Sequence, residues 1–294
     1  MRIYDSIVKC IPIEYGWSGD RKYCAVTDRG ERFFLRTADI SRLERKKREF
    51  EKMKEVEALG IPMCRPLEIG TTDESVYVIH SWIEGTDAEG EIGRMSDAEQ
   101  YRYGLDAGRI LKKIHSIPAP ENVPDWETRF NAKIDRKIEM YRTCAMKYEN
   151  GEAFLNYLAR NRHLLSGRPQ SYQHGDYHVG NMMIDRNGTL TVIDFDRDDF
   201  GDPWEEFNRI VWSAQAAPSF ASGMVDGYFD AQVPEAFWRL LALYMSSNAL
   251  GSLPWAVDFG EAEVRVMLNQ GKQILSWYEG MTRVVPRWYN SKEK

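Results

Sequence analysis

The stretch SYQHGDYHVGNMMID, residues 171–185, decides how this chain is interpreted. Gly175 and Gly180 favour a loop over a helix across its middle part, and the apolar residues after Asn181 begin an extended segment. Asp176 on such a loop can accept a proton from a hydroxyl group. The side-chain oxygen of Asn181 is a hard ligand of the kind that suits Mg²⁺. The stretch therefore predicts a loop that combines a general base with a metal ligand.

A second acidic stretch, TVIDFDRDDFGDP, follows at residues 191–203. Between the two stretches, the apolar MMI, the turn signal DRNG and the apolar LTVID predict a short hairpin that ends at Asp194. A hairpin brings the carboxylate at its end back to the residue that precedes it. Asn181 and Asp194 are therefore expected to hold Mg²⁺ between them, with Asp176 nearby.

Length and composition set the broad class of the protein. The chain has 294 residues, 43% hydrophobic and 29% charged, which predicts two lobes of an ordinary soluble protein. The formal net charge of −6 gives no reason to bind nucleic acid and mildly favours a cationic partner. No signal peptide and no apolar run of about 20 residues is evident, so a cytoplasmic protein without a membrane span is expected. Oligomeric state is not indicated.

The first 83 residues predict a small sheet with one long helix. KYCAVT and ERFFLRT flank the turn signal DRG, which predicts a hairpin over residues 22–37. The capping box of Ser41 and Glu44 predicts the start of the helix, and Gly60 its end. The basic run 45–48 is interpreted as the solvated face of this helix. Two further extended segments complete the sheet, at residues 67–70 and 76–82.

A glycine-containing loop from residue 84 marks the predicted boundary between the lobes. Ser96 and Glu99 form a second capping box, which opens a helix that reaches about Ile117. The remaining chain is mostly helical by its periodicity. We therefore predict an α+β fold with a nucleotide-binding lobe over residues 1–83 and a mainly helical lobe over residues 84–294.

The strings HGDYHVGN and DFD resemble the protein-kinase loops H-R-D-x-x-x-x-N and D-F-G. Gly175 stands where kinases have Arg, and Asp196 stands where they have Gly. These departures are typical of the aminoglycoside phosphotransferase family, which also includes macrolide and choline-type kinases. Over nearly its whole length the chain resembles that family, which implies a protein-kinase-like two-lobe fold.

The resemblance implies roles for the loop residues. Asp176 would orient and deprotonate the acceptor hydroxyl, and Asn181 and Asp194 would hold Mg²⁺. His174 and His178 would have structural roles. Supporting groups are expected further along: Asp202 would hold the loop, and Glu205 and Glu206 would either begin a helix or face a cationic substrate.

A nucleotide site is implied in the first lobe. FFLR, residues 33–36, resembles the strand that carries the phosphate-binding cation, so Arg36 would grip phosphate oxygens where the family often has Lys. An exposed strand arginine is the alternative. Glu49 is the candidate for the helix partner of Arg36, because Glu44 is better explained as a cap, and Glu51 is the alternative in an ambiguous register.

Two further segments are assigned to the nucleotide. GWSGDRKY, residues 16–23, resembles the loop over the phosphates, so Ser18 and the backbone around Gly19 would contact them. A plain hairpin turn is the alternative there. VYVIHSWIEG resembles the hinge, so the Ser81 carbonyl and the Ile83 N–H would contact the adenine, in a register that is ambiguous by one residue.

The family implies transfer of the γ-phosphoryl group of ATP or GTP to a hydroxyl group of a small molecule. An aminoglycoside is the favoured acceptor because it is cationic and gives the family its name. A macrolide, choline, a sugar or an amino-alcohol metabolite are the alternatives. A protein kinase is disfavoured because no A-P-E string follows DFD, and a non-catalytic nucleotide-binding module is disfavoured because all the expected motif residues are present.

Overall fold

The computed structural model describes residues 2–14 and 19–290. It divides into two compact units that do not follow the chain in order. The first unit comprises Met1–Ala88 and Asn181–Asp198, and the second comprises Glu89–Gly180 and Asp199–Lys294. The hairpin after the HGDYHVGN loop thus belongs to the same unit as the N-terminal sheet.

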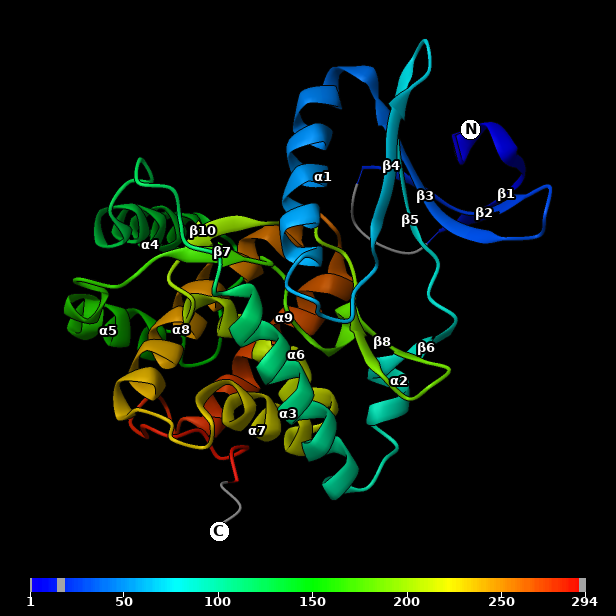
Figure 1. Ribbon diagram of the computed structural model, residues 1–294. Helices are drawn as coiled ribbons and strands as arrows, with labels where there is room; N and C mark the ends of the chain where they lie inside the picture. Colours follow the sequence, from blue (N-terminus) through cyan, green and yellow to red (C-terminus); the bar gives the residue numbers. More distant parts are fainter. Residues whose placement is uncertain (1, 15–18, 291–294) are drawn as a thin grey trace. The chain divides into compact units, whose positions relative to one another are not determined.

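An antiparallel five-stranded sheet forms the body of the first unit (Figure 1). The predicted hairpin over residues 22–37 is confirmed, with Tyr23 opposite Leu35 and Gly30 at a φ of 78° in the turn. Ala25, Leu35 and Ile79 form the centre of its apolar core. In spatial order the strands are β1 Ile7–Ile13, β2 Arg21–Thr27, β3 Arg32–Asp39, β5 Ser75–Ser81 and β4 Pro66–Thr71.

Helix α1, Leu43–Glu57, packs against β4 and β5 through Phe50 and Met53. The predicted capping box at its start is wrong. Asp39 instead accepts the Ser41 N–H at the preceding 3₁₀ turn η2, Ile40–Arg42, while Glu44 pairs with Lys47. Asp39 lies two residues before Ser41 and so takes the capping position first.

A second, three-stranded sheet completes the first unit. It consists of β6 Gly85–Asp87, β8 Met182–Asp185 and β9 Leu190–Val192. The predicted β8–β9 hairpin is confirmed, with Met182 opposite Val192, and the Asp185 carboxylate accepts the N–H groups of its turn. Val192 also accepts a hydrogen bond from the Cys64 N–H, 3.0 Å away. The hairpin is therefore attached to the segment that leads into the large sheet.

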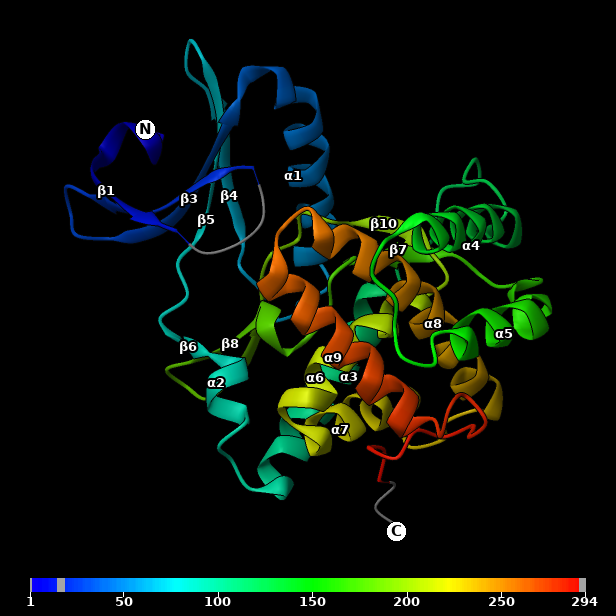
Figure 2. The same cartoon turned by 180° about the vertical axis from the view of Figure 1, so that it is seen from behind.

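The second unit is mainly helical, and Figure 2 shows α8 and α9 side by side. The capping box of Ser96 and Glu99 is confirmed at the start of α3. Helices α3 and α7 approach closely because glycines line their contact: a Cβ at Gly104 would lie 2.1 Å from the Phe220 carbonyl oxygen. The helices are α2 Ala88–Ile92, α3 Asp97–Ile114, α4 Trp126–Thr143, α5 Glu152–Asn161, α6 Ile210–Ala216, α7 Pro218–Phe229, α8 Glu235–Val257 and α9 Glu261–Trp277.

Short elements of the second unit hold the HGDYHVGN loop. Strands β7, Ser171–Gln173, and β10, Asp199–Gly201, pair antiparallel on either side of it in sequence. Beyond β10 lies the 3₁₀ helix η5, Glu205–Arg209. The loop ends in the short 3₁₀ turn η4, Val179–Asn181.

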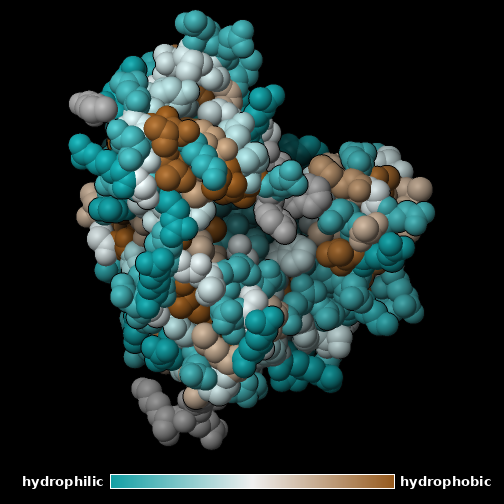
Figure 3. All heavy atoms as spheres, turned by 90° about the vertical axis from the view of Figure 1, so that its right-hand side faces the viewer, coloured by the Kyte–Doolittle hydropathy of each residue, from teal (hydrophilic) through white to brown (hydrophobic). Residues whose placement is uncertain are grey.

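The surface is mostly hydrophilic on the face drawn in Figure 3. Large exposed apolar side chains include Val8 and Ile11 of the edge strand β1. Among the helices of residues 2–14 and 19–290, none combines the length and the hydropathy that crossing a membrane requires.

Candidate functional site

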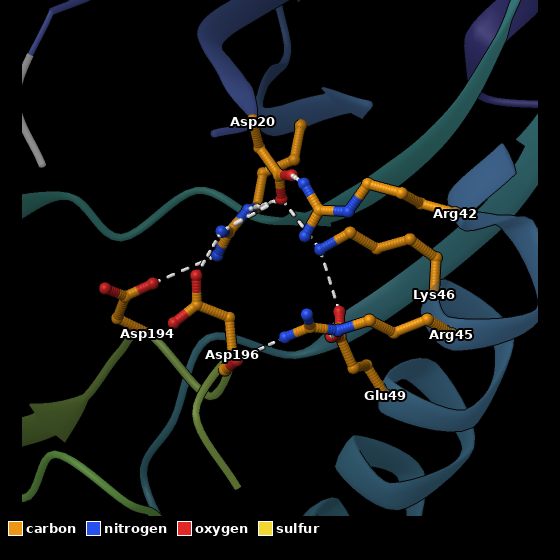
Figure 4. Close-up of polar contacts among 8 residues, drawn as sticks. Asp20, Arg42, Arg45, Lys46, Glu49, Asp194 and Asp196 are labelled. Atoms are coloured by element: carbon orange, nitrogen blue, oxygen red, sulfur yellow. Dashed lines mark hydrogen bonds and ion pairs between the residues drawn. The ribbon is translucent and has the colours of Figure 1, made fainter. Parts of the chain in front are cut away.

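A buried guanidinium group lies at the centre of a charged cluster in the first unit (Figure 4). Arg36 extends from β3, and its side chain is only 7% exposed. Its nitrogens lie 3.0 Å from Asp20 Oδ2, 3.0 Å from Asp194 Oδ1 and 2.5 Å from Asp196 Oδ2. Burial alone would lower the pKa of Arg36, but the charges of Asp196 and Asp194 hold it above its usual value. Arg36 is therefore a fixed cation in contact with the predicted metal ligand Asp194.

Asp20 binds three cations at once. Its fully buried carboxylate contacts Arg36, the Arg42 guanidinium at 2.5 Å and the Lys46 ammonium at 2.7 Å. Burial would raise the pKa of Asp20, but the hydrogen bond from Lys46 and the charge of Arg36 outweigh it and lower the pKa. Asp20 stays ionised near neutral pH and fixes the positions of these cations.

Lys46 corrects the interpretation of the basic run on α1. Its side chain is 5% exposed, and its Nζ lies 2.7 Å from both Asp20 Oδ2 and Glu49 Oε2. Arg45, the preceding residue, pairs with the other oxygen of Glu49 at 2.6 Å. The Glu49 carboxylate is thus joined to Arg36 through Lys46 and Asp20.

One pocket collects these groups. Arg36, Lys46, Glu49 and the two carboxylates Asp194 and Asp196 line it, and its apolar wall comprises Phe34, Phe50, Met53, Val78 and Phe195. Two further titratable groups line the pocket, His80 and Cys64. Burial and the positive charges of Arg36 and Lys46 lower the pKa of His80 to about 3, and burial raises the pKa of Cys64 to about 12. Both are neutral at pH 7.

The β8–β9 hairpin brings the two predicted metal ligands together. The Ile193 N–H donates to the Asn181 carbonyl oxygen at 3.0 Å, so Asn181 and Asp194 lie at the open end of one hairpin. Asp194 has a φ of 66°, a left-handed conformation that few residues other than glycine adopt. Both side chains offer oxygen donors, which are the ligands that Mg²⁺ takes in proteins.

One buried carboxylate, that of Glu206, binds the backbone of the loop around Asp176. Glu206 of η5 accepts the Gly175 N–H at 3.0 Å and the Tyr177 N–H at 3.4 Å. Gly175 has a φ of 84°, so the turn needs a glycine there. Glu205 and Glu206 do begin a helical turn, as expected. The structure adds that Glu206 positions the loop, a contact across 31 residues that no local pattern indicated.

The Asp176 carboxylate is partly exposed and meets one cation directly. Arg209 Nε lies 3.2 Å from Asp176 Oδ1, and His178 Nε2 lies 3.7 Å from the same oxygen. Each loop histidine accepts a backbone hydrogen bond through Nδ1: His174 from the Asp176 N–H and His178 from the Gly180 N–H. These contacts are those expected of structural histidines.

Asp202 is fully buried behind the loop. It accepts both nitrogens of Arg168, at 2.7 and 2.9 Å, and the Tyr244 hydroxyl at 2.5 Å. Its own carbonyl oxygen accepts the Gln173 side-chain N–H at 2.8 Å. Asp202 thus ties η5 and α8 to β7, the strand that leads into the loop.

The other residues predicted to contact the nucleotide belong to two segments of the first unit. Ser18 falls outside the described residues, and Gly19 directly precedes Asp20. Ser81 ends β5, where its N–H donates to the Arg65 carbonyl and its hydroxyl accepts the Arg65 N–H. Ile83 follows two residues later. Their predicted contacts with a nucleotide stay predictions.

Sequence reasoning missed several residues of these clusters. Asp20 and Lys46 organise the first cluster, and Arg209 contacts Asp176. Glu206 was expected to begin a helix or face a substrate, and its contact with the loop was missed. Only Lys46 carried a usable signal, because it shares the apolar stripe of α1 with Phe50.

An antiparallel sheet with one long helix, a mainly helical second unit and a polar HGDYHVGN loop define a kinase-like phosphotransferase. The sequence model of the phosphotransferase enzyme family, APH, matches residues 9–240. The chain therefore belongs to this family, and the resemblance seen in its motifs is confirmed. A search among curated proteins finds no match.

Solved structures share the fold at low identity. Aminoglycoside phosphotransferase APH(4)-Ia, in a thermostable mutant bound to ADP and hygromycin B, superposes with a TM-score of 0.65 at 18% identity, covering 93% of this chain and 95% of that one. The amicoumacin kinase hAmiN, bound to AMP-PNP, Ca²⁺ and Ami, gives 0.65 at 13% identity over 95% and 90%. Aminoglycoside-3'-phosphotransferase of type VIII gives 0.56 at 18% identity over 82% and 93%. The predicted kinase-like α+β fold is confirmed.

Proposed function

We propose that this phosphotransferase moves the γ-phosphoryl group of ATP or GTP to a hydroxyl group of a small molecule. The acceptor oxygen forms a bond to the γ-phosphorus, the bond from that phosphorus to the β-phosphate bridging oxygen breaks, and the acceptor proton passes to Asp176. The observation that carries the proposal is the contact of Arg36 with Asp194 in one pocket. It joins a cation suited to phosphate with a carboxylate suited to Mg²⁺.

The nucleotide side of the proposal assigns roles within residues 1–83. Arg36 binds phosphate oxygens, with Glu49 as its more distant helix partner, and Ser18 and Gly19 cover the phosphates. Ser81 and Ile83 contact the base through their backbone groups. Lys46 joins this set because its buried ammonium lines the same pocket.

In the same proposal, residues 84–294 contain the catalytic loop, the metal site and the acceptor pocket. Asn181 and Asp194 hold Mg²⁺, which would neutralise phosphate charge when it is bound. Asp176 orients the acceptor hydroxyl and takes its proton, and Glu206 keeps the loop in the shape that presents Asp176.

Aminoglycosides are the first acceptors to test, because APH(4)-Ia is bound to hygromycin B in a structure of the same fold. Arg209 at Asp176, with Lys133 at nearby Glu205, favours a second class of acceptor, hydroxyl compounds with an anionic group. Choline, macrolides, neutral sugars and amino alcohols complete the panel.

The test is a coupled assay of ADP or GDP release with Mg²⁺ across this panel, with Asp176→Ala as the blank. Release that requires one acceptor, and that the variant abolishes, supports the proposal. Acceptor-dependent release at an undiminished rate in Asp176→Ala would contradict the role of Asp176.

A further inference from the structure

Lysine side chains of helix α4 lie close to the 3₁₀ helix η5. Lys133 Nζ lies 3.2 Å from Glu205 Oε1, and Gln173 Nε2 donates to the other oxygen of Glu205 at 3.3 Å. The Glu205 side chain is 13% exposed. Burial would raise the pKa of Glu205, but the charges of Lys133 and Lys137 lower it, so this carboxylate stays ionised.

Lys137, one turn further along α4, has no such partner. No ion pair or hydrogen bond of its ammonium is found within residues 2–14 and 19–290. Its aliphatic stem packs on Gly251 of α8, where an added Cβ would lie 2.9 Å from Lys137 Cε. Burial, with the charges of Lys133, Arg209 and Arg136 and against the charge of Glu205, lowers the pKa of Lys137 to about 7.

The local charges do not balance. Lys133, Arg209 and Arg136 act electrostatically on Lys137, and Lys133, Lys137 and Arg209 act on Glu205. Arg209 also contacts Asp176 at 3.2 Å. Lys133 and Arg209 each contact a carboxylate, whereas Lys137 makes no such contact among the residues that the structure describes. A half-buried charge without a partner is costly, so an anionic group bound beside Lys137 would stabilise this region of the second unit.

The cations are open to a ligand from solvent. The Lys133 side chain is 36% exposed and that of Arg209 is 26% exposed. Because Arg209 touches the carboxylate that would take the acceptor proton, a group bound at Arg209 would lie beside Asp176, where it can be part of the same small molecule as the reacting hydroxyl.

We propose that the acceptor of this phosphotransferase carries an anionic oxygen group, a carboxylate or a phosphate, which binds to Lys137 with Lys133 and Arg209. The inference rests on the proposed function for the role of Asp176. It predicts a small hydroxy acid or a phosphorylated alcohol as the acceptor, in preference to a polycationic aminoglycoside.

Binding is tested first, without any turnover. Sulfate is titrated calorimetrically into the full chain with the nucleotide site saturated by ADP and Mg²⁺. We expect sulfate to bind, and Lys137→Met to weaken the binding at least ten-fold. Arg142→Met, which removes an exposed cation from the same helix, is the matched control and leaves it unchanged.

Lys133→Met provides a second variant if Lys137→Met lowers the melting temperature. We expect Lys133→Met to weaken sulfate binding several-fold. The proposal is overturned if the wild type does not bind sulfate under these conditions. It is also overturned if folded Lys137→Met or Lys133→Met binds sulfate as tightly as the Arg142→Met control.

Turnover then compares acceptors with and without a carboxylate: glycerate with glycerol, glucuronate with glucose, and homoserine with 3-aminopropanol. We expect a lower KM for the acidic member, and a ten-fold rise of that KM in Lys137→Met with the KM for ATP unchanged. Anion binding that depends on Lys137, without turnover of any acceptor, would keep the anion site and weaken the proposed function. Turnover of a neutral or cationic acceptor that is indifferent to Lys137 would keep the function and overturn the anion site.

Discussion

The charged clusters of the two units differ in how completely they are paired. In the first unit, four cations meet four carboxylates: Arg36, Arg42, Arg45 and Lys46 with Asp20, Glu49, Asp194 and Asp196. In the second unit, Lys133 and Arg209 have carboxylate partners, and Lys137 has none within the part of the chain that the structure describes. A balanced network with a buried centre holds its geometry before any ligand arrives, whereas an unbalanced one favours a ligand of the missing charge.

The largest effect on catalysis is expected at Asp176. Asp176→Ala removes the group that would take the hydroxyl proton, a contribution typically of about 10²–10⁴-fold in rate. We expect kcat to fall by that factor and the melting temperature to change little, because Asp176 is partly exposed and its partners are partly exposed too. Steady-state kinetics and thermal melting measure both. Equal loss of rate in Arg142→Met would show that the effect is not specific.

Replacing Asp20 tests whether the charged cluster of the first unit stabilises the fold. Asp20→Ala would leave Arg36, Arg42 and Lys46 without their shared carboxylate, and breaking a buried pair typically costs about 3–5 kcal/mol. We expect a loss of that size in the free energy of unfolding, measured by urea denaturation. Asp5→Ala, which removes an exposed ion pair with Arg2, is the matched control. A loss no larger than that of Asp5→Ala would mean that the cluster is not pre-formed in solution.

A smaller loss of stability is expected when the contact of Glu206 with the loop is removed. Glu206→Ala leaves the buried N–H of Tyr177 and the partly buried N–H of Gly175 without this acceptor, at a typical cost of about 1–3 kcal/mol for a buried group. Both stability and kcat should fall, since the loop that presents Asp176 loosens. Glu206→Gln keeps an acceptor oxygen and should restore part of both. Retention of full kcat in folded Glu206→Ala would exclude a positioning role.

Features set by neighbouring residues were predictable from the sequence, because their signals are local. The 22–37 hairpin, the Ser96 capping box and the β8–β9 hairpin that brings Asn181 to Asp194 are of this kind. The Ser41 capping box failed because Asp39 competes for the same turn two residues earlier. The loop motif and the family resemblance supplied the rest of the fold.

The clusters themselves were less predictable, because their contacts are long-range. Arg36 meets Asp194 across 158 residues, and Gly175 meets Glu206 across 31. Lys46 was assigned to the solvated face because it lies in a basic run, although its helical phase matches that of Phe50 and Met53. Charge pattern and apolar periodicity conflict at that residue, and burial followed the periodicity.

Lys137 should make the stability of the fold depend on pH. Its pKa falls from the ordinary value of 10.5 in the unfolded chain to about 7 in the folded one, so between these values the unfolded chain binds more protons. Stability therefore rises with pH across that window and is lowest below pH 7, where the half-buried ammonium is charged in both states. Urea denaturation at pH 6, 8 and 9.5 should show this rise in the wild type. Lys137→Met should flatten it, and sulfate, which favours the charged form, should stabilise the wild type most at pH 6. An unchanged pH profile in the variant would assign the rise to another group and remove the unpaired charge on which the comparison depends.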